Sequence, residues 1–458
     1  MDQLSSFSNV TLSESAWTHP MCPTFKPNQL FQNPVNELLV VDFDETLTVS
    51  DTISHLADLA LNTFENVHRR NPIRRKKWIS DILEYENDLE KFQTWWDEEL
   101  PARNATNAKR CAGSQESCLT IKDLGEYLAK SDEVELASIE RVSKHKILEG
   151  LSRKVLLESG AEDIPRQEKA LESIRTWLAN SSYAEHPWKY GGEHVVDITD
   201  KGAQLQEAVN FQPKFHRDWA ILSNNWSRDM ILGALFPMAD TSLDKLIASN
   251  MGTEAPWAYY CYLVSRIHSG DLEFTPGEPR TVPENLPAKE RISKYWSQLE
   301  TSESTGKFTS TIRTGLDKLR EFRTIRSNYQ RKLAMQVVYP SLGSVEKPRL
   351  FTIYVGDKLN DLLCMLEASV GILVGQDKKV LAWAKVLQIP VETKLPPYQD
   401  LVARHHRGTM EGECKRHRKR DIVTTAAGTI ALPNTNGPIY QIDNWEQFNE
   451  WANRDASK

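Results

Sequence analysis

The chain has 458 residues, of which 40% are hydrophobic and 26% are charged, enough for a large core and typical of two compact units. The net charge of -7 gives no indication of a nucleic-acid partner, and the six scattered cysteines predict neither a zinc site nor a disulfide framework. No signal-peptide pattern and no apolar run of membrane length is present. We expect a cytoplasmic protein without membrane partners, whose oligomeric state the sequence does not indicate.

The first half of the chain changes character twice. Residues 1–34 are rich in Ser, Thr, Asn and Pro without periodicity and predict a loosely ordered lead. The apolar run at 38–41 is typical of a buried parallel strand. Residues 52–182 then carry apolar side chains at helical spacing and predict a helical block inserted after that strand, and 183–210 predict a connection.

Strands and helices alternate from residue 211 to 400, and apolar runs predict buried strands at 219–222, 351–355 and 370–374. Within this part, the polar segment 265–313 is expected to be an inserted loop region. Residues 401–458 predict a polar C-terminal extension that ends in a short strand and a helix. The predicted fold class is therefore α/β, a mostly parallel Rossmannoid sheet formed by 35–51 and 211–400, with an α-helical domain inserted after its first strand.

Three of the predicted strands end in polar side chains that suit one another chemically: Asp42 and Asp44, then Ser223, then Asp357 and Asp361. Ligands of open α/β sheets bind at this edge. Acids placed just past a buried strand are costly there unless they bind a metal or move a proton. A plain polar turn is the alternative for the first pair taken alone.

Hydrolysis of a phosphomonoester requires such groups. A carboxylate can accept the phosphoryl group only if a cation lies between the two anions, and Mg²⁺ prefers oxygen ligands, which Asp42 and Asp357 would supply. Asp44 can protonate the leaving oxygen and then deprotonate the attacking water. Ser223, with Asn224 beside it, and the adjacent backbone N–H groups can hold phosphoryl oxygens. A lysine is still needed to neutralise the anionic cluster.

These residues resemble the motifs of the haloacid dehalogenase (HAD) superfamily of phosphohydrolases. The pattern DxDx[TV] matches residues 42–46, the strand ending in Ser or Thr matches Ser223, and GDxxxD matches 356–361. The resemblance implies that Asp42 is the nucleophile and Asp44 the acid/base, and that Ser223 contacts the phosphate. It further implies Asp357 as a metal ligand, Asp361 as a supporting acid beside the metal, and the backbone carbonyl of Asp44 as another ligand.

The lysine of the third motif has several candidates, namely Lys307, Lys318, Lys332 and Lys347. We choose Lys318 as the catalytic and phosphate-binding lysine, because it lies at the start of a predicted helix, a common placement in the family. Lys347, which follows a loop close to the next strand, is the alternative, and Lys318 would then be a surface residue.

The helical block lies where the family places a type 1 cap, which closes over the site and contacts the leaving group. Asp51 at the junction of core and cap and Trp226, three residues past Ser223, are candidate substrate contacts. Most aromatic residues of the block are expected to be core, and Trp226 is the best exception.

A closer similarity links the chain to the phosphatase half of the plant bifunctional thiamin-salvage proteins. It is carried by Thr352–Asp357, by Asp361–Ala368, by Gly371-Ile372 and by Ser223 with Trp226. That family dephosphorylates thiamin monophosphate, so the resemblance implies this ester as a candidate substrate. The insertion at 265–313 is a departure from that family. The resemblance therefore predicts the fold and the reaction type of this chain better than it predicts the substrate.

We therefore expect a Mg²⁺-dependent phosphomonoesterase that acts on a small phosphorylated metabolite through an aspartyl-phosphate. A phosphotransferase or mutase on the same scaffold is one alternative. A catalytically silent binding protein is another, and the intact Asp42, Asp44 and Asp357 argue against it. Basic runs at 69–77 and 415–420 are interpreted as solvated surface, with a nuclear address or a polyanion contact as the alternative.

Overall fold

The computed structural model describes residues 35–63, 71–108, 119–162, 168–179, 215–235, 263–275, 301–309, 312–337, 350–402, 405, 421–425, 428–433 and 437–453. The predicted N-terminal lead, the connection at 183–210 and Lys347 lie outside these residues. Among the helices of the described part, none combines the length and the apolar character that crossing a bilayer requires.

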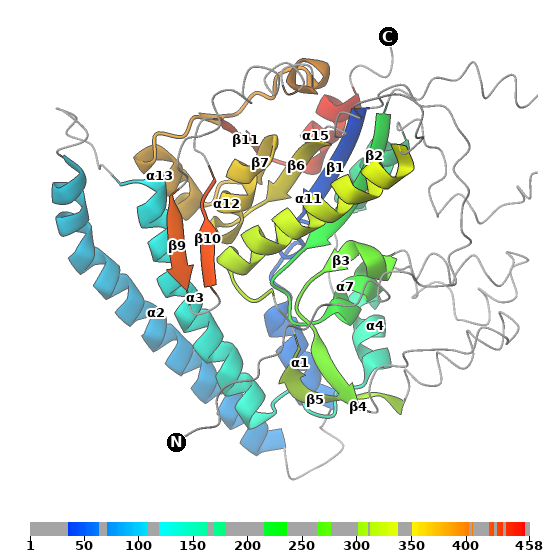
Figure 1. Cartoon of the computed structure of the whole chain (residues 1–458). Coiled ribbons are helices and arrows are strands. Elements are labelled where there is room, and N and C mark those ends of the chain that lie inside the picture. The colour runs from blue at the N-terminus through cyan, green and yellow to red at the C-terminus, as the bar shows by residue number, and fades with distance from the viewer. Residues whose placement is uncertain are drawn as a thin grey trace, which may run out of the picture.

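A seven-stranded sheet forms the centre of the protein, and every strand pairing within it is parallel (Figure 1). The strand order is β3-β2-β1-β6-β7-β11-β8. The strands are β1 (Val35–Val41), β2 (Phe215–Leu222), β3 (Ile267–His268), β6 (Leu350–Gly356), β7 (Val370–Val374), β8 (Val391–Glu392) and β11 (Ile439–Ile442). The α/β fold class predicted from the alternating apolar runs is confirmed.

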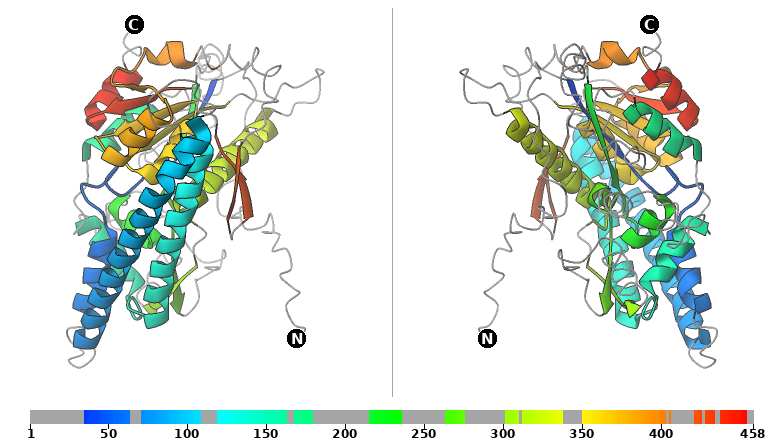
Figure 2. Two further views of the ribbon diagram at one scale, coloured as in Figure 1. Left: turned by 90° about the vertical axis from the view of Figure 1, so that its left-hand side faces the viewer. Right: turned by 90° about the vertical axis from the view of Figure 1, so that its right-hand side faces the viewer.

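Helices cover both faces of the sheet, because side chains of successive strand residues point to opposite sides. On β1, Leu39 and Val41 belong to the core beneath α5 (Glu168–Ala179), α7 (Arg228–Leu235) and α15 (Trp445–Asn453). Leu38 and Val40 belong to the opposite core, beneath α11 (Gly315–Val337), α12 (Leu359–Glu367) and α13 (Lys378–Val386). The sheet is thus the middle of three layers (Figure 2).

The helices between β1 and β2 are α1 (Ile53–Thr63), α2 (Asn71–Ala108), α3 (Ile121–His145), α4 (Arg153–Glu162) and α5. The two long helices α2 and α3 lie side by side and project beyond the sheet (Figures 1 and 2). Their aromatic side chains pack on α13, with ring centroids of Trp96 and Tyr127 at 5.4 and 5.3 Å from that of Trp383. The predicted helical block is helical in its described residues, and α2 and α3 are its longest helices. Helix α5, the last helix of the block, packs on the core sheet. The domain boundaries stay a prediction.

Helices α4 and α7 approach each other closely at two glycines. A Cβ atom on Gly233 would lie 2.0 Å from the carbonyl oxygen of Leu157, and one on Gly160 would lie 2.2 Å from that of Met230. No larger residue fits without a shift of the backbone. This contact fixes α4 against the helix that follows β2, close to the site described below.

The segment expected as an inserted loop region contains strands in its described residues. Besides the edge strand β3, it forms the antiparallel pair β4 (Leu272–Thr275) and β5 (Glu303–Phe308). In β4, Leu272 and Phe274 are buried and alternate with more exposed residues. Four residues of alternation are too few to separate a strand from a polar loop in sequence. A second hairpin, β9 (Ile422–Thr425) with β10 (Gly428–Ala431), packs near α3.

Candidate active site

Three carboxylates and one lysine converge at the carboxyl ends of β1 and β6. Asp42 directly follows β1, and its backbone N–H donates to the carbonyl of Val355 at 2.9 Å. One carboxylate oxygen from each of Asp42, Asp357 and Asp361 lies within 4.8 Å of the others. The Nζ atom of Lys318 lies 2.8 Å from Oδ1 of Asp42 and 2.8 Å from Oδ1 of Asp361. All four side chains are buried.

Burial and mutual repulsion perturb these groups strongly. Burial raises the pKa of Asp42 well above its usual range, and the nearby carboxylate of Asp361 raises it further. Burial together with Asp361 also raises the pKa of Asp357, to about 7. Burial alone would lower the pKa of Lys318, but the carboxylates of Asp361 and Asp42 outweigh it and raise that pKa. Lys318 therefore stays charged, opposite three acids.

The donor set of this cluster fits a divalent cation. When all three carboxyl groups are ionised, they face one ammonium group and leave an excess of negative charge in a region of low dielectric. Carboxylate oxygens are the hard ligands that Mg²⁺ prefers. Asp42, Asp357 and Asp361 are the residues that would hold it.

The loop after β6 is shaped around Asp361. A Cβ atom on Gly356 would lie 2.6 Å from Cγ of Asp361, so a glycine is needed there. Oδ2 of Asp361 accepts backbone N–H groups of Asp357 and Lys358, at 3.3 and 3.2 Å. Its Oδ1 accepts the Tyr354 hydroxyl at 2.7 Å. The carboxylate is thereby held in one orientation.

Asp44 lies apart from the lysine, in the turn after β1. Glu45, which follows it, has φ of 56°, a left-handed conformation that turns the chain sharply. Oδ1 of Asp44 accepts the backbone N–H of Thr52 at 3.0 Å and its hydroxyl at 2.5 Å. Oδ2 accepts the Asn225 amide at 3.2 Å and the Ser223 hydroxyl at 3.4 Å. Four donors therefore fix this carboxyl group.

Burial raises the pKa of Asp44, although hydrogen bonds from Thr52 and Asn225 oppose the shift and the charge of Asp51 adds to it. A raised pKa keeps a larger share of the carboxyl groups protonated near neutral pH. The arrangement can therefore place a proton donor two residues from Asp42, as acid–base chemistry requires.

The other predicted site residues lie close by, with differences in detail. Ser223 is fully buried at the end of β2. The Oδ1 atom of Asn224 is buried without a hydrogen-bond partner among the described residues. Asp51 is exposed, and its Oδ1 accepts the backbone N–H of Ile53 at 2.8 Å, at the start of α1. Trp226 is half-buried, its ring packed edge-to-face against Trp78 and Phe308.

Three residues of the site were not among the sequence candidates. Asn225 reaches both Asp44 and the hydroxyl of Thr52, the latter at 2.5 Å. The Thr46 hydroxyl donates to Oδ1 of Asp357 at 2.8 Å. Thr46 could have been found from its place in DxDx[TV], whereas neither Thr52 nor Asn225 stands in a pattern that marks it.

The long helices α2 and α3 present polar groups to the loop that bears Asp357 and Asp361. Glu135 of α3 accepts the Asn360 amide at 3.4 Å, and burial raises its pKa to about 7. Tyr85 of α2 has a pKa raised to about 12 by burial, with further contributions from Glu135 and Asp51. On the core side, Lys358 lies 3.0 Å from Glu45. The surroundings of the carboxylate cluster on the side of α2 and α3 are thus acidic and aromatic.

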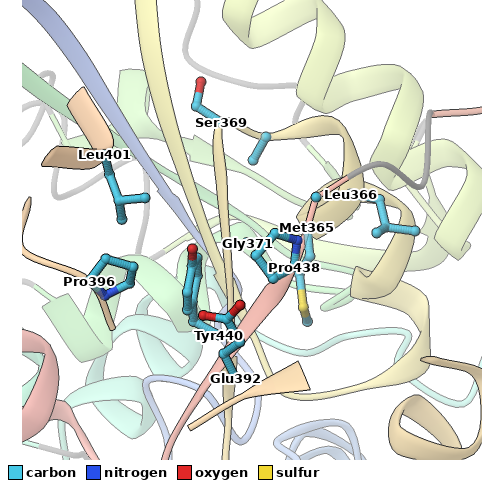
Figure 3. A pocket seen from close by; sticks show the side chains of 11 residues that line it. Met365, Leu366, Ser369, Gly371, Glu392, Pro396, Leu401, Pro438 and Tyr440 are labelled. Carbon is cyan, nitrogen blue, oxygen red and sulfur yellow. The ribbon is translucent and has the colours of Figure 1, made fainter. Parts of the chain in front are cut away.

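A separate pocket of about 350 Å³ lies at the amino ends of β7 and β11 (Figure 3). Its lining includes Met365, Ser369, Glu392 and Tyr440, and none of the carboxylates described above. Since Asp42 and Asp357 follow the carboxyl ends of β1 and β6, this pocket is distinct from the carboxylate cluster.

Comparison with known proteins gave few matches, and no family model matches the chain. Over 153 residues the chain is 21% identical to the bifunctional TH2 protein, mitochondrial, of Arabidopsis thaliana; the match covers 33% of this chain and 20% of that protein. A solved structure of phosphoserine phosphatase, a phospho-aspartyl intermediate analogue, covers 76% of this chain and 90% of its own at 12% identity, with a TM-score of 0.26. The match to the TH2 protein agrees with the resemblance to HAD-superfamily phosphatases that the sequence motifs predict.

Proposed function

We propose that this chain is a Mg²⁺-dependent phosphomonoesterase that works through an aspartyl-phosphate on Asp42. The observation that carries the proposal is that the two carboxyl groups just after β1 have different neighbours. Asp42 lies beside the ammonium group of Lys318 and the acids Asp357 and Asp361. Asp44 instead lies among neutral donors, Thr52 and Asn225.

In the first step, a carboxylate oxygen of Asp42 attacks phosphorus, and the bond from phosphorus to the ester oxygen breaks. Asp44 gives its proton to that leaving oxygen, which departs as a neutral alcohol. In the second step, Asp44 takes a proton from water, the water oxygen attacks phosphorus, and Asp42 is released with inorganic phosphate. Mg²⁺, when bound, offsets the negative charge of the phosphoryl group and of the carboxylates.

Lys318 and Ser223 hold the phosphoryl group in this scheme. Lys318 is fixed between Asp42 and Asp361, so its charge is already placed before the substrate enters. The Ser223 hydroxyl lies 3.4 Å from Asp44 at the end of β2, where it can donate to a phosphoryl oxygen instead. Both groups would stabilise the charge that develops in the transition state.

Thiamin monophosphate is the substrate that we propose to test first. The sequence resembles the plant thiamin-salvage phosphatases, and Glu135 of the cap and Asp51 at the junction add negative charge near the catalytic loop. The charges of Glu135 and Asp51 both raise the pKa of the Tyr85 hydroxyl, so this aromatic side chain lies near both carboxylates. An alcohol with a positively charged aromatic ring complements such surroundings better than one that carries a carboxylate.

The reaction is tested by phosphate release from p-nitrophenyl phosphate with Mg²⁺. We expect turnover in the wild type, loss of turnover on chelation with recovery on adding Mg²⁺, and no turnover in Asp42→Asn. Asp400→Asn, which changes an exposed carboxylate, is the control and should stay active. Undiminished hydrolysis by Asp42→Asn would overturn the mechanism.

The substrate and the acceptor are tested next. A panel of thiamin monophosphate, pyridoxal phosphate and sugar or polyol phosphates should give its highest kcat/KM with thiamin monophosphate. Product analysis with an added acceptor alcohol separates hydrolysis from phosphotransfer: we expect inorganic phosphate to remain the main product. A phosphorylated acceptor as the main product would make the chain a phosphotransferase.

A further inference from the structure

Helix α15, near the C-terminal end of the described chain, contacts the loop that carries the catalytic carboxylates. The indole N–H of Trp445 donates to the backbone carbonyl of Thr46 at 2.9 Å. Both residues are buried, at 1% and 0% exposure. This contact joins residues separated by 399 positions in the chain. It lies two residues after Asp44, in the turn that contains the left-handed Glu45.

From Thr46 the chain of hydrogen bonds continues to the acidic cluster. The Thr46 hydroxyl donates to Oδ1 of Asp357 at 2.8 Å. A single residue therefore receives a hydrogen bond at its carbonyl from α15 and passes one from its side chain to Asp357. Because the carbonyl and the hydroxyl belong to one rigid β-branched residue, fixing the first restricts the second.

Trp445 is itself anchored firmly. Its own carbonyl accepts the Ser173 hydroxyl of α5 at 3.0 Å, and its ring packs edge-to-face on Phe448 with centroids 5.2 Å apart. The strand just before it, β11, is an inner strand of the sheet, and its Ile442 carbonyl accepts the N–H of Gly375 at 2.8 Å. The donor that reaches Thr46 is thus built into the rigid core, on the face where α5 and α15 pack together (Figure 2).

We propose that Trp445 is a positioning residue for Asp357, acting through the carbonyl and the hydroxyl of Thr46. The inference rests on the proposed function, since it assumes that Asp357 holds the divalent cation. Hydrogen bonds to a metal-ligating carboxylate orient it, and loss of such a partner typically weakens metal affinity or activity by about 10–100-fold. Without the indole N–H, the buried Thr46 carbonyl loses this donor and the turn can relax.

The test compares two tryptophans of the same helix. Trp445→Phe removes the N–H but keeps an aromatic ring. Trp451→Phe makes the same chemical change at a residue whose indole N–H donates to the backbone carbonyl of Pro396 at 2.7 Å, and not to the turn after β1. We expect Trp445→Phe to bind Mn²⁺, measured by electron paramagnetic resonance as a probe for the cation, about tenfold more weakly than the wild type. Trp451→Phe should bind within about twofold of the wild type, and circular dichroism should show both variants folded.

Substitutions at Thr46 test the route. Thr46→Val removes the hydroxyl and should weaken Mn²⁺ binding at least as much as Trp445→Phe, whereas Thr46→Ser should restore most of it. Equal Mn²⁺ affinity of the two tryptophan variants would overturn the proposal, as would unchanged binding by Thr46→Val. If Trp445→Phe does not fold, Mn²⁺ binding by Thr46→Val and Thr46→Ser decides whether the proposal holds. A wild type that binds no Mn²⁺ and releases no phosphate would instead overturn the proposed function itself.

Discussion

The Nζ atom of Lys318 lies 2.8 Å from Oδ1 of Asp42, and both side chains are buried. Lys318 comes from the first turn of α11, whereas Asp42 follows β1, so the contact depends on the packing of that helix against the sheet. The ammonium group serves two carboxylates at once, because Asp361 lies at the same distance. It is the cation around which the acidic cluster is arranged.

Removal of this cation should abolish most of the activity. We expect Lys318→Met to lower kcat/KM for p-nitrophenyl phosphate by about 10²–10³-fold, the usual effect of losing one group that stabilises transition-state charge. Lys347→Met is the matched control and should resemble the wild type. If Lys347→Met is inactive while Lys318→Met is active, the assignment of the third-motif lysine is wrong.

The role of Asp44 predicts a dependence on the leaving group. Nitrophenolate departs without much help from a proton, whereas an alkoxide needs one. Asp44→Asn should therefore lower kcat for an alkyl phosphate by at least about tenfold more than for p-nitrophenyl phosphate, within the range of 10²–10⁴-fold typical of acid–base catalysis. Steady-state kinetics with both esters measures this ratio. Equal losses for the two esters would contradict the assignment of Asp44 as the proton donor.

The acidic cap predicts a selective effect of Glu135. We expect Glu135→Gln to raise KM for thiamin monophosphate by about tenfold, which corresponds to about 1.4 kcal/mol, and to leave KM for p-nitrophenyl phosphate unchanged. Glu133→Gln changes an exposed carboxylate on the same helix and serves as the control. A parallel rise of KM for both esters in Glu135→Gln would show that the residue acts on closure of the cap and not on the alcohol.

Asp132 predicts how stability depends on pH. It is 6% exposed on α3, and burial, together with the charge of Glu135, raises its pKa to about 8, although the Thr314 hydroxyl opposes the shift. In the unfolded chain its pKa is about 3.9. The folded state therefore holds the proton over a range where the unfolded state has lost it, so stability from this group is complete below about pH 4 and is lost as pH rises towards 8.

Urea denaturation at pH 6 and pH 8 measures this linkage. The free energy of unfolding of the wild type should fall over this interval by about 1–2 kcal/mol more than that of Asp132→Asn, since each pKa unit corresponds to 1.36 kcal/mol. Glu133→Gln should follow the wild type. Identical pH dependence in all three proteins would show that Asp132 is charged in the folded state.

Much of the core could be predicted because it depends on local patterns. The apolar runs that became β1, β2 and β6 are short, bounded and buried on both faces, which makes parallel strands recognisable. Since all parallel strands of a sheet end at one edge, the polar residues after each run could be expected to meet there. Asp42, Ser223 and Asp357 follow this rule.

The rest of the site depends on contacts between distant segments. Asn224 and Asn225 are neighbours of the same residue type. Only the backbone conformation after β2 determines that Asn225 is the one whose amide reaches Asp44. Thr52 acts through the turn that leads into α1. Trp445 reaches Thr46 across 399 positions, from a segment that reads in sequence as the end of a polar extension. Such contacts leave no periodicity or spacing to find.

The most direct test of the account is to trap the phosphoryl group on Asp42. The enzyme would be mixed with substrate and Mg²⁺, quenched in acid during turnover, digested, and examined by mass spectrometry for peptides that gain a phosphoryl group. We predict that the modification lies on the peptide containing residue 42, maps to Asp42, and is absent in Asp42→Asn. Steady phosphate release with no phosphorylation of Asp42, in either the wild type or the slower Asp44→Asn variant, would contradict the proposed mechanism.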